Sequence, residues 1–262
     1  MENVKKFEIG NCTLYCGDAF DVLPKLDIVA NAVVTDPPFG ITNCEWDKAP
    51  PPNKFWELVE AKSAQNANYV LFGAGKFTID LINSNRESYR YDLVWSKNTK
   101  CGFLNANYQP LRSHESILIF NRPGFFKQAT YNPLRTPGGR IGVRSISRKT
   151  DGVYGAVKEH VSICDGYQHP SSVLCFNSDR GKNNRQKKHP TAKPVQLLEW
   201  LVLTYSNEND IVLDPFLGSG ATALACIKHN RKFIGIEQSA EYFEMAVRRA
   251  KQCYDECAAA IF

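Results

Sequence analysis

The sequence predicts an α/β fold with a doubly wound, mostly parallel sheet and an irregular insertion in the middle of the chain. Short apolar runs alternate with stretches of helical periodicity towards both ends, as in strands joined by crossover helices. Two of these runs end in Asp-Pro, at residues 36–37 and 214–215. Between residues 121 and 188 the alternation stops. A chain of 262 residues can bury the core of one large domain that carries such an insertion.

The first part of the chain, residues 1–120, predicts one half of the core. The apolar run at 32–35, stopped by Asp-Pro-Pro, fits a strand buried on both faces of a parallel sheet. The other elements expected here are strand pieces up to residue 16, a short helix to residue 23, helices at 55–66 and 77–83, and strands at 69–72, 91–95 and 116–120.

The middle part, residues 121–188, is rich in Gly, Pro, Ser, Asn and Arg, and only 173–176 predicts a strand. Residues 121–190 contain 13 Lys and Arg against 4 Asp and Glu, a local charge of +9, which leaves −4 for the rest of the chain. A basic zone on a neutral to acidic body is typical of a nucleic-acid-binding surface. A solvated loop rich in lysine and arginine would give the same count.

The last part, residues 189–262, predicts the second half of the core. Thr191 can cap a helix over 195–206 that has Pro194 near its first turn. Then follow a strand at 211–213, a glycine turn, a helix up to 230, a strand at 233–236 that ends in Glu237, and a helix over 241–257.

Composition excludes several classes of protein. The nine cysteines include no CxxC pair, so neither a disulfide framework nor a zinc site is expected, and we predict no metal. The N-terminus lacks the apolar run of a signal peptide, and no stretch approaches the roughly 18 apolar residues of a membrane-spanning helix. A cytosolic or nuclear protein with reduced thiols is expected.

The segment TDPPFG at 35–40 combines a carboxylate, backbone carbonyls next to prolines, and an aromatic face. Asp36 and the Pro37 carbonyl can accept hydrogen bonds, and Phe39 can stack, so Pro37-Pro38-Phe39 after Asp36 suits a flat heterocycle with an amino group. A plain turn would also accommodate Asp-Pro-Pro, but that reading becomes improbable when the second Asp-Pro segment is considered with it.

The segment DPFLGSGATA at 214–223 matches the loose GxGxxA pattern of a glycine turn that opens a helix, and Glu237 follows the next strand. This pattern permits a nucleoside cofactor held close to the backbone, NAD included. Asp214 is unusual for a dehydrogenase because a carboxylate there would face an anionic pyrophosphate. A carboxylate suits a cationic ligand, such as a sulfonium or an amino-acid ammonium.

Together the two segments resemble the reaction loop and cofactor loop of amino-directed DNA methyltransferases that use S-adenosylmethionine. The reaction loop comes first and the basic segment lies between the two, as in the permuted β group, and HPTAKP at 189–194 is similar to a third marker of that group. The resemblance runs from about Tyr15 to about Arg249. It implies a Rossmann-like sheet of the class I methyltransferase type with an inserted target-recognition region at 121–188.

The resemblance assigns roles to single residues. In the target site, Asp36 and the Pro37 carbonyl would accept hydrogen bonds from the amino group and Phe39 would stack on the base; tyrosine is commoner there, so a hydroxyl hydrogen bond is lost. The expected cofactor residues are Asp18 for the adenine amino group, Glu237 for ribose, Phe216, Gly218 and Gly220 for the methionine part, Thr191 and Lys193 for its carboxylate, and Asp36, Asp214, Ser219 and Thr222 around them. Phosphate contacts are expected from Arg135, Arg140, Arg144, Lys187 and Lys188.

Adenine N6 in a flipped-out base of double-stranded DNA is the preferred target, because an Asp-led loop resembles adenine enzymes more often than the Ser-led loop typical of cytosine N4 enzymes. The alternatives are an N4-cytosine DNA methyltransferase, an RNA N6-adenine methyltransferase, an NAD-dependent oxidoreductase and a catalytically silent DNA-binding module. No Pro-Cys dipeptide occurs, which argues against cytosine C5 methylation. The resemblance also points to a cytoplasmic protein of a prokaryote or phage and leaves open a homodimer and a restriction endonuclease partner; we expect no contact with a membrane.

Overall fold

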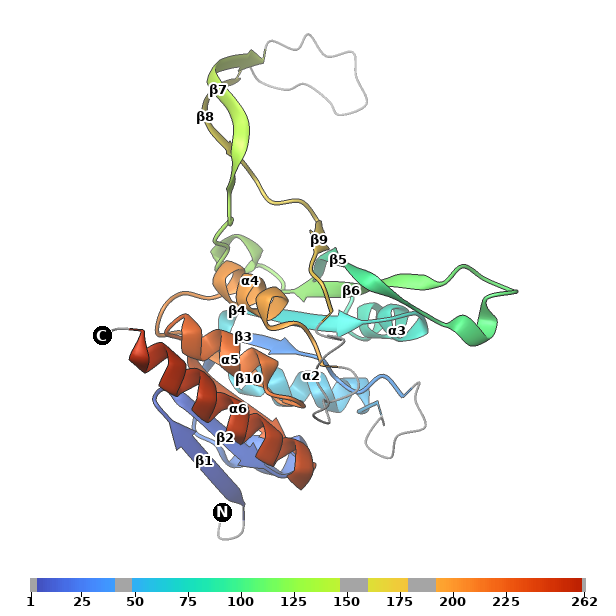
Figure 1. Ribbon diagram of the computed structural model, residues 1–262, viewed down its shortest axis with the longest axis vertical. Coiled ribbons are helices and arrows are strands. Elements are labelled where there is room, and N and C mark those ends of the chain that lie inside the picture. The colour runs from blue at the N-terminus through green and yellow to red at the C-terminus, as the bar shows by residue number, and fades with distance from the viewer. Residues whose placement is uncertain (1–3, 41–48, 147–159, 179–191, 261–262) are drawn as a thin grey trace. The chain divides into compact units, whose positions relative to one another are not determined.

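The computed structural model describes residues 4–40, 49–146, 160–178 and 192–260. The chain divides into two compact units (Figure 1). The first is formed by Met1–Asn132 with Ser172–Phe262, and the second by Pro133–Ser171. The first contains the large sheet and its helices, and the second contains a two-stranded sheet.

Among the described residues, nine strands of the first unit form one sheet in the order β1-β2-β11-β10-β3-β4-β6-β5-β9. They are β1 (Lys5–Ile9), β2 (Cys12–Cys16), β3 (Ala30–Thr35), β4 (Ser63–Gly73), β5 (Tyr89–Cys101), β6 (Arg112–Phe120), β9 (Val173–Cys175), β10 (Ile211–Asp214) and β11 (Lys232–Glu237). The five central strands, from β2 to β4 in spatial order, are parallel neighbours, while β1 and β6 run antiparallel to theirs. The predicted mostly parallel sheet is confirmed.

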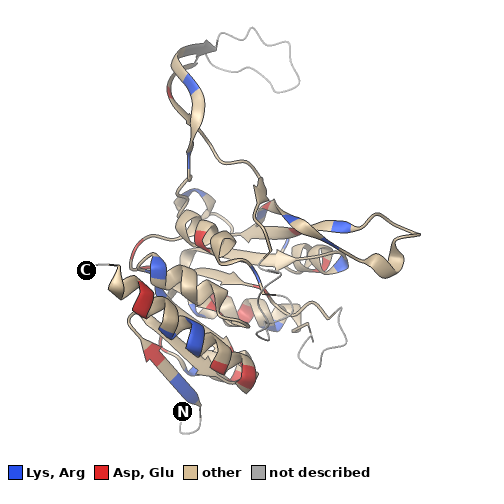
Figure 2. Ribbon diagram, viewed as in Figure 1, with Lys and Arg blue, Asp and Glu red and all other residues tan. Residues whose placement is uncertain are grey.

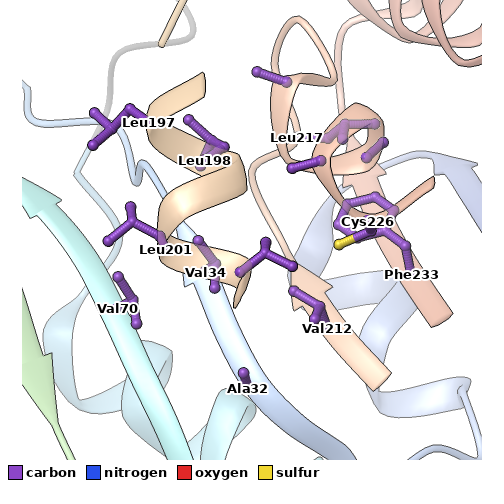
Figure 3. Packing of buried hydrophobic residues seen from close by; sticks show 14 of the residues in the cluster. Ala32, Val34, Val70, Leu197, Leu198, Leu201, Val212, Leu217, Cys226 and Phe233 are labelled. Atoms are coloured by element: carbon purple, nitrogen blue, oxygen red, sulfur yellow. The ribbon is translucent and has the colours of Figure 1, made fainter. Parts of the chain in front are cut away.

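Helices cover both faces of this sheet, which makes it doubly wound as predicted. The helices are α1 (Ala19–Val22), α2 (Pro52–Ala61), α3 (Lys76–Ser84), α4 (Val195–Tyr205), α5 (Ala221–Lys228) and α6 (Ala240–Ala259). Buried side chains of α4, α5 and α6 pack on one face, and those of α1, α2 and α3 on the other. Figure 3 shows Leu197, Leu198 and Leu201 of α4 against Val34 and Val70 of the sheet.

Strand β3 shows why a continuous apolar run is needed in such a sheet. Its residues from Ala32 to Thr35 are all buried, with Val34 in the core under α4–α6 and Val33 in the core under α1–α3. Successive side chains of a strand point to opposite faces, so a strand covered on both sides must be apolar at every position. Burying a valine in this way contributes about 1.5 to 3 kcal/mol.

Element boundaries differ from the predicted ones in several places; β5 (Tyr89–Cys101) and β6 (Arg112–Phe120), for example, are longer than the expected strands at 91–95 and 116–120. Helix α2 ends at Ala61 and β4 already begins at Ser63, because the polar start of this strand, Gln65 and Asn66, lacks the apolar pattern that marks its buried end. Helix α4 begins at Val195 with Pro194 in the N-cap position, and the predicted cap Thr191 lies outside the described residues.

The second unit holds an antiparallel pair, β7 (Thr136–Ile146) and β8 (His160–Gln168). The sequence predicts irregular structure there because glycine and proline interrupt the pattern. Ile141 and Val143 are nevertheless two residues apart on β7, and Val143 pairs with Ile163 on β8. All three side chains are exposed. The alternation of these apolar side chains is the signal of a hairpin that the glycines obscured.

Candidate functional site

The two Asp-Pro segments meet at the same edge of the sheet. β3 and β10 are parallel neighbours with Val33 opposite Leu213, so both chains leave the sheet side by side. The Thr35 hydroxyl donates a hydrogen bond of 2.6 Å to Asp214 Oδ1, which links the segments directly although 179 residues separate them. The carboxyl ends of β2, β4 and β11 lie at this edge too, because these strands are parallel to β3 and β10. In open α/β sheets, ligands bind at this edge.

A cavity of about 740 Å³ opens at this edge within the first unit. Its volume lies within the range of about 300 to 1,000 Å³ typical of small-molecule sites. Of the residues predicted for the site, it is lined by Asp18, Asp36, Pro37, Pro38, Phe39, Lys193, Asp214, Phe216, Gly218, Ser219, Thr222 and Glu237. The structure thus gathers residues from both segments around one space.

Gly220, which was expected beside the cofactor, is not among the residues that line the cavity. It is the N-cap of α5 with φ +79°, and a Cβ atom here would lie 2.9 Å from Ala246 Cβ of α6. The absence of a side chain therefore serves the left-handed turn and the close packing of α5 on α6.

Asp214 is buried, and both of its carboxylate oxygens are engaged. Besides the Thr35 bond, Oδ1 accepts from the Phe216 amide at 3.2 Å and Oδ2 accepts from the Thr222 hydroxyl at 2.8 Å. Burial raises the pKa of Asp214 to about 6, against the opposing effect of these donors. Its carboxylate fixes the turn after β10 and joins it to β3.

Asp36 has a different environment. Its Oδ2 forms an ion pair with the buried Lys193 ammonium, whereas Oδ1 is buried and accepts no hydrogen bond from the described residues. Lys193 Nζ also lies 3.4 Å from Glu115 Oε2, and Glu115 Oε1 pairs with Lys97. A chain of alternating charges thus runs from the reaction loop to β6 and β5.

The pKa values of this chain follow from burial and charge. Burial raises the pKa of Asp36, and the charge of Lys193 opposes this rise. Burial alone would lower the pKa of Lys193, but the charges of Asp36 and Glu115 outweigh it and raise that pKa, so the lysine stays protonated. Burial would likewise raise the pKa of Glu115, but Lys193 and Lys97 lower it overall.

Phe39 is half-buried beside these charges. Its ring centroid lies 4.7 Å from that of Phe77, and the Lys193 ammonium lies 5.8 Å from the Phe39 centroid. The same ammonium lies 4.9 Å from the centroid of the buried Phe72. Lys193 therefore lies against Asp36 and Phe39, the two side chains expected to handle the base, and its contact with the cofactor carboxylate stays a prediction.

The expected cofactor residues Asp18 and Glu237 lie at the ends of β2 and β11. Glu237 is buried, and it accepts hydrogen bonds of 2.8 Å from the Gly218 amide at Oε2 and from the Ser239 amide at Oε1. Asp18 Oδ1 accepts from the Phe20 amide at 2.7 Å and caps α1. Burial raises the pKa of Glu237, and its backbone donors oppose the rise. Both carboxylates keep further lone pairs for a ligand in the cavity.

Of the five predicted phosphate contacts, the structure describes the side chains of two. Arg135 forms a two-pronged pair with Asp165, with Nη1 at 2.8 Å from Oδ2, and its guanidinium lies 5.6 Å from the Tyr167 ring centroid. Arg140 is exposed on β7. Arg144 lies on β7 opposite Ser162, and its side chain is not among those described. Lys187, Lys188 and Thr191 lie outside the described residues.

Comparison with known proteins agrees with this geometry. A family model described as DNA methylase, of the N6 and N4 type, matches residues 30–248. The chain belongs to this N6/N4 DNA methylase family. It is 28% identical over 251 residues to type II methyltransferase M.HpaI of Haemophilus parainfluenzae, covering 90% of this chain and 73% of the relative. It is 27% identical to type II methyltransferase M1.MboII of Moraxella bovis, covering 94% and 96%.

Solved structures share the fold. A complex of M1.HpyAVI with S-adenosylmethionine superimposes with a TM-score of 0.60 at 24% identity, covering 91% of this chain and 99% of that one. The cytosine-N4-specific PvuII DNA methyltransferase gives a TM-score of 0.62 at 17% identity, covering 97% and 96%. The predicted class I methyltransferase fold is thus confirmed.

This DNA methylase is an amino-directed DNA methyltransferase, as the sequence predicted. The expected methyl donor is S-adenosylmethionine, which the M1.HpyAVI complex contains. The cavity suits this donor. Its lining includes the carboxylates of Asp18 and Glu237, which can accept hydrogen bonds from an amino group and from ribose hydroxyls, and a glycine turn that permits close approach. No helix among the described residues is long and apolar enough to cross a membrane, and no group of three His, Cys, Asp or Glu side chains among them could hold a metal ion.

Sequence reasoning missed several residues of the methylase site. Glu115 and Lys97 belong to the charge chain, and Arg112, Cys101 and Tyr242 also line the cavity. Glu115 could have been noticed in the sequence, because it is an acidic residue two positions before the run of buried residues that begins at Ile117. Lys97, Cys101 and Arg112 belong to no motif, and only strand pairing brings them to the site.

Proposed function

We propose that this protein transfers the methyl group of S-adenosylmethionine to the N6 amino group of adenine in DNA. The observation that carries the proposal is made at Asp36, which lines the cavity and whose Oδ1 is buried with no donor among the described residues. A buried acceptor without a partner is costly, and a ligand amino group would supply the missing hydrogen bond.

An exocyclic amino group is a poor nucleophile because its lone pair is delocalised into the ring. Asp36 Oδ1 and the Pro37 carbonyl would each accept one of its N–H groups, which draws the nitrogen towards tetrahedral geometry and localises the lone pair. When bound, S-adenosylmethionine supplies an electrophilic methyl group for in-line attack. The Asp36 charge stabilises the positive charge that develops on the nitrogen. The ion pair with Lys193 at Oδ2 fixes the orientation of the carboxylate.

The target base must leave the duplex to reach this carboxylate, at a cost of a few kcal/mol. Stacking on Phe39, worth roughly 1 to 3 kcal/mol per base in comparable sites, offsets part of that cost. Phe77 supports the ring on which the base would stack.

On the cofactor side, the main roles fall to Asp18 for the adenine amino group, Glu237 for the ribose hydroxyls, and the Phe216–Gly218 turn for the methionine part. Ser219 and Thr222 contribute to the same wall. Asp214 acts indirectly, because its hydrogen bonds to Thr35 and Thr222 hold the two loops at a fixed separation.

Adenine is preferred over cytosine because an aspartate leads the reaction loop. Support comes from DNA adenine methyltransferase YhdJ of Escherichia coli K12, which is 46% identical over 80 residues, although these cover only 30% of this chain and 27% of the relative. Under this proposal the basic segment at 121–188 reads the DNA site.

The direct test is to incubate the purified protein with methyl-labelled S-adenosylmethionine and mixed genomic DNA, and then to separate the nucleosides. We expect label in N6-methyladenine. Label in N4-methylcytosine alone would overturn the choice of base, and label only after RNA is supplied would overturn the choice of DNA. The Asp36→Ala variant serves as the control, because it should yield no labelled nucleoside while still binding the methyl donor.

A further inference from the structure

A hairpin arm, formed by residues 97–112 where β5 turns into β6, extends from the cavity wall. β5 and β6 pair regularly up to Ser96 and His114, lose register, and pair again only at Cys101 and Arg112. Figure 1 shows this hairpin continuing past the end of β4. A bulge of this kind bends a strand and redirects the chain beyond it.

The tip of the arm exposes large apolar side chains. All residues from Gly102 to Pro110 are exposed, and Phe103, Leu104 and Tyr108 are 68%, 98% and 89% exposed. Three such side chains together on one turn are unusual for a surface without a partner.

The tip owes its shape to its own backbone and not to packing. Gly102 has φ +90° and begins a short 3-10 helix (Phe103–Asn105), whose Asn105 amide bonds to the Gly102 carbonyl at 3.0 Å. The Tyr108 amide then bonds to the Asn105 carbonyl at 2.9 Å. The apolar side chains are therefore presented on a preformed turn and need little ordering on binding.

The charge of the arm identifies the kind of partner. From residue 96 to residue 114 there is no acidic residue, while Lys97, Lys100 and Arg112 are basic. Figure 2 shows basic residues and no acidic residue along this arm. Exposed apolar side chains flanked only by cations match a duplex, which offers phosphates on its outside and a base stack within.

The base of the arm belongs to the site already described. Lys97, Cys101 and Arg112 line the cavity together with Asp36, and Lys97 holds Glu115 in the charge chain. Whatever the tip contacts therefore lies next to the place where the target base is expected.

We propose that the arm is a wedge: Phe103 and Leu104 enter the base stack beside the target and occupy the space that the flipped base leaves, while Lys100 and Arg112 contact the flanking phosphates. Inserted apolar side chains lower the cost of unstacking, because they replace the stacking that the departing base loses. This inference rests on methyl transfer to DNA but not on the choice between adenine and cytosine.

The test compares a Phe103→Ala/Leu104→Ala double variant with the wild type on two duplexes that contain a methylated site mapped from genomic DNA. One duplex is fully paired, and the other has an abasic position opposite the target base, which makes extrusion easy. We expect the variant to be at least about tenfold slower on the paired duplex and close to wild type on the other. Leu104→Met, which keeps an apolar side chain of similar size, should retain most of the rate.

Val29→Ala is the matched control, because Val29 is also an exposed apolar residue, 60% exposed, but precedes β3 at the edge of the sheet opposite the site. It should behave as wild type on both duplexes. A double variant that is slowed equally on the two duplexes, or on neither, would overturn the wedge. A change in sedimentation without a defect confined to the paired duplex would identify the tip as a contact between copies of the chain and would also overturn it.

A second measurement separates this inference from the proposed function. With 2-aminopurine at the target position, binding of the wild type and a non-reactive donor analogue should raise the fluorescence as the base leaves the stack, and the double variant should lose most of this rise. The signal does not depend on turnover or on the natural target. Production of N4-methylcytosine would thus end the adenine proposal and leave the wedge intact, whereas equal fluorescence in variant and wild type would end the wedge alone.

Discussion

Asp36 and Asp214 stand at the ends of two neighbouring parallel strands, and proline follows each of them. Asp214 is buried with both oxygens hydrogen-bonded to Thr35, Thr222 and the backbone of Phe216. Asp36 has one oxygen paired with Lys193 and the other without a donor among the described residues. The same dipeptide at the same edge thus serves as a structural link in one strand and as an incomplete binding group in the other. The unmet hydrogen bond of Asp36 Oδ1, in a residue that lines the cavity, distinguishes this aspartate from Asp214.

The largest effect should come from replacing Asp36, the aspartate with the unmet hydrogen bond. We expect Asp36→Ala to slow single-turnover methyl transfer by about 10²- to 10³-fold or more, because the charge that stabilises the developing positive nitrogen is lost. Affinity for the methyl donor, measured by calorimetry, should change little. Loss of donor affinity with transfer preserved would show that the two aspartates had been assigned each other's roles.

The buried carboxyl group of Asp214 predicts an unusual dependence of stability on pH. Its pKa of about 6 lies above the usual value of 3.8, so the folded state holds this proton more tightly than the unfolded state does. The stabilisation is therefore full below about pH 4 and is lost as the pH rises through about 6, by about 3 kcal/mol at most.

Urea unfolding at several pH values checks this, with Asp214→Asn as the matched variant that cannot titrate at this position. The free energy of unfolding of the wild type, relative to that of the variant, should fall as the pH rises from about 4 to about 6. A difference that stays constant, or that grows with pH, would contradict the buried carboxyl described here.

Removing Lys193 should sharpen the contrast between the aspartates. In Lys193→Met the ammonium no longer opposes the rise in the Asp36 pKa, and Glu115, then paired with Lys97 alone, remains as a like charge nearby. We expect transfer near neutral pH to fall by about tenfold, and the acidic limb of the profile of kcat/KM against pH to move to higher pH. Lys193→Arg should restore much of the limb's position. A uniform loss without movement of the limb would assign Lys193 to the cofactor instead.

The smallest effect concerns the basic segment, where two arginines differ as the two aspartates do. Arg135 is already paired with Asp165, whereas Arg140 is exposed on β7. We expect Arg140→Gln to reduce the slope of log DNA affinity against log salt by about 0.9, and Arg135→Gln to reduce it less. Fluorescence anisotropy over a salt series measures both slopes. Equal slopes for Arg140→Gln and the wild type would remove Arg140 from the DNA contacts.

Much of the fold could be predicted because its signals are local. The run from Ala32 to Thr35 and its stop at Asp36 predicted β3, and the same reasoning placed β10 before its glycine turn. The register that sets Val33 beside Leu213, and so brings the two loops together, depends on pairing between distant strands, and the sequence could only suggest it through a resemblance.

The parts that could not be predicted depend on contacts without a local pattern. Glu115 and Lys97 join the site through the pairing of β5 with β6, and no residue spacing in the sequence predicts this pairing. The position of Lys193 between Asp36 and Glu115 was not predicted either; a buried ammonium needs carboxylates around it, and both come from distant parts of the chain. The β7–β8 hairpin went unpredicted because its exposed apolar residues lie among glycines.

The most direct test of the central claim is the distance between the target amino nitrogen and Asp36 Oδ1 in a crystal structure of the protein with a methylatable duplex and a non-reactive analogue of S-adenosylmethionine. We predict a hydrogen bond of about 2.7 to 3.2 Å, with Asp36 Oδ2 still paired to Lys193 and the carboxylate of Asp214 still bonded to Thr35 and Thr222. A flipped base whose amino nitrogen contacts neither Asp36 oxygen, or one held by Asp214 instead, would contradict the account.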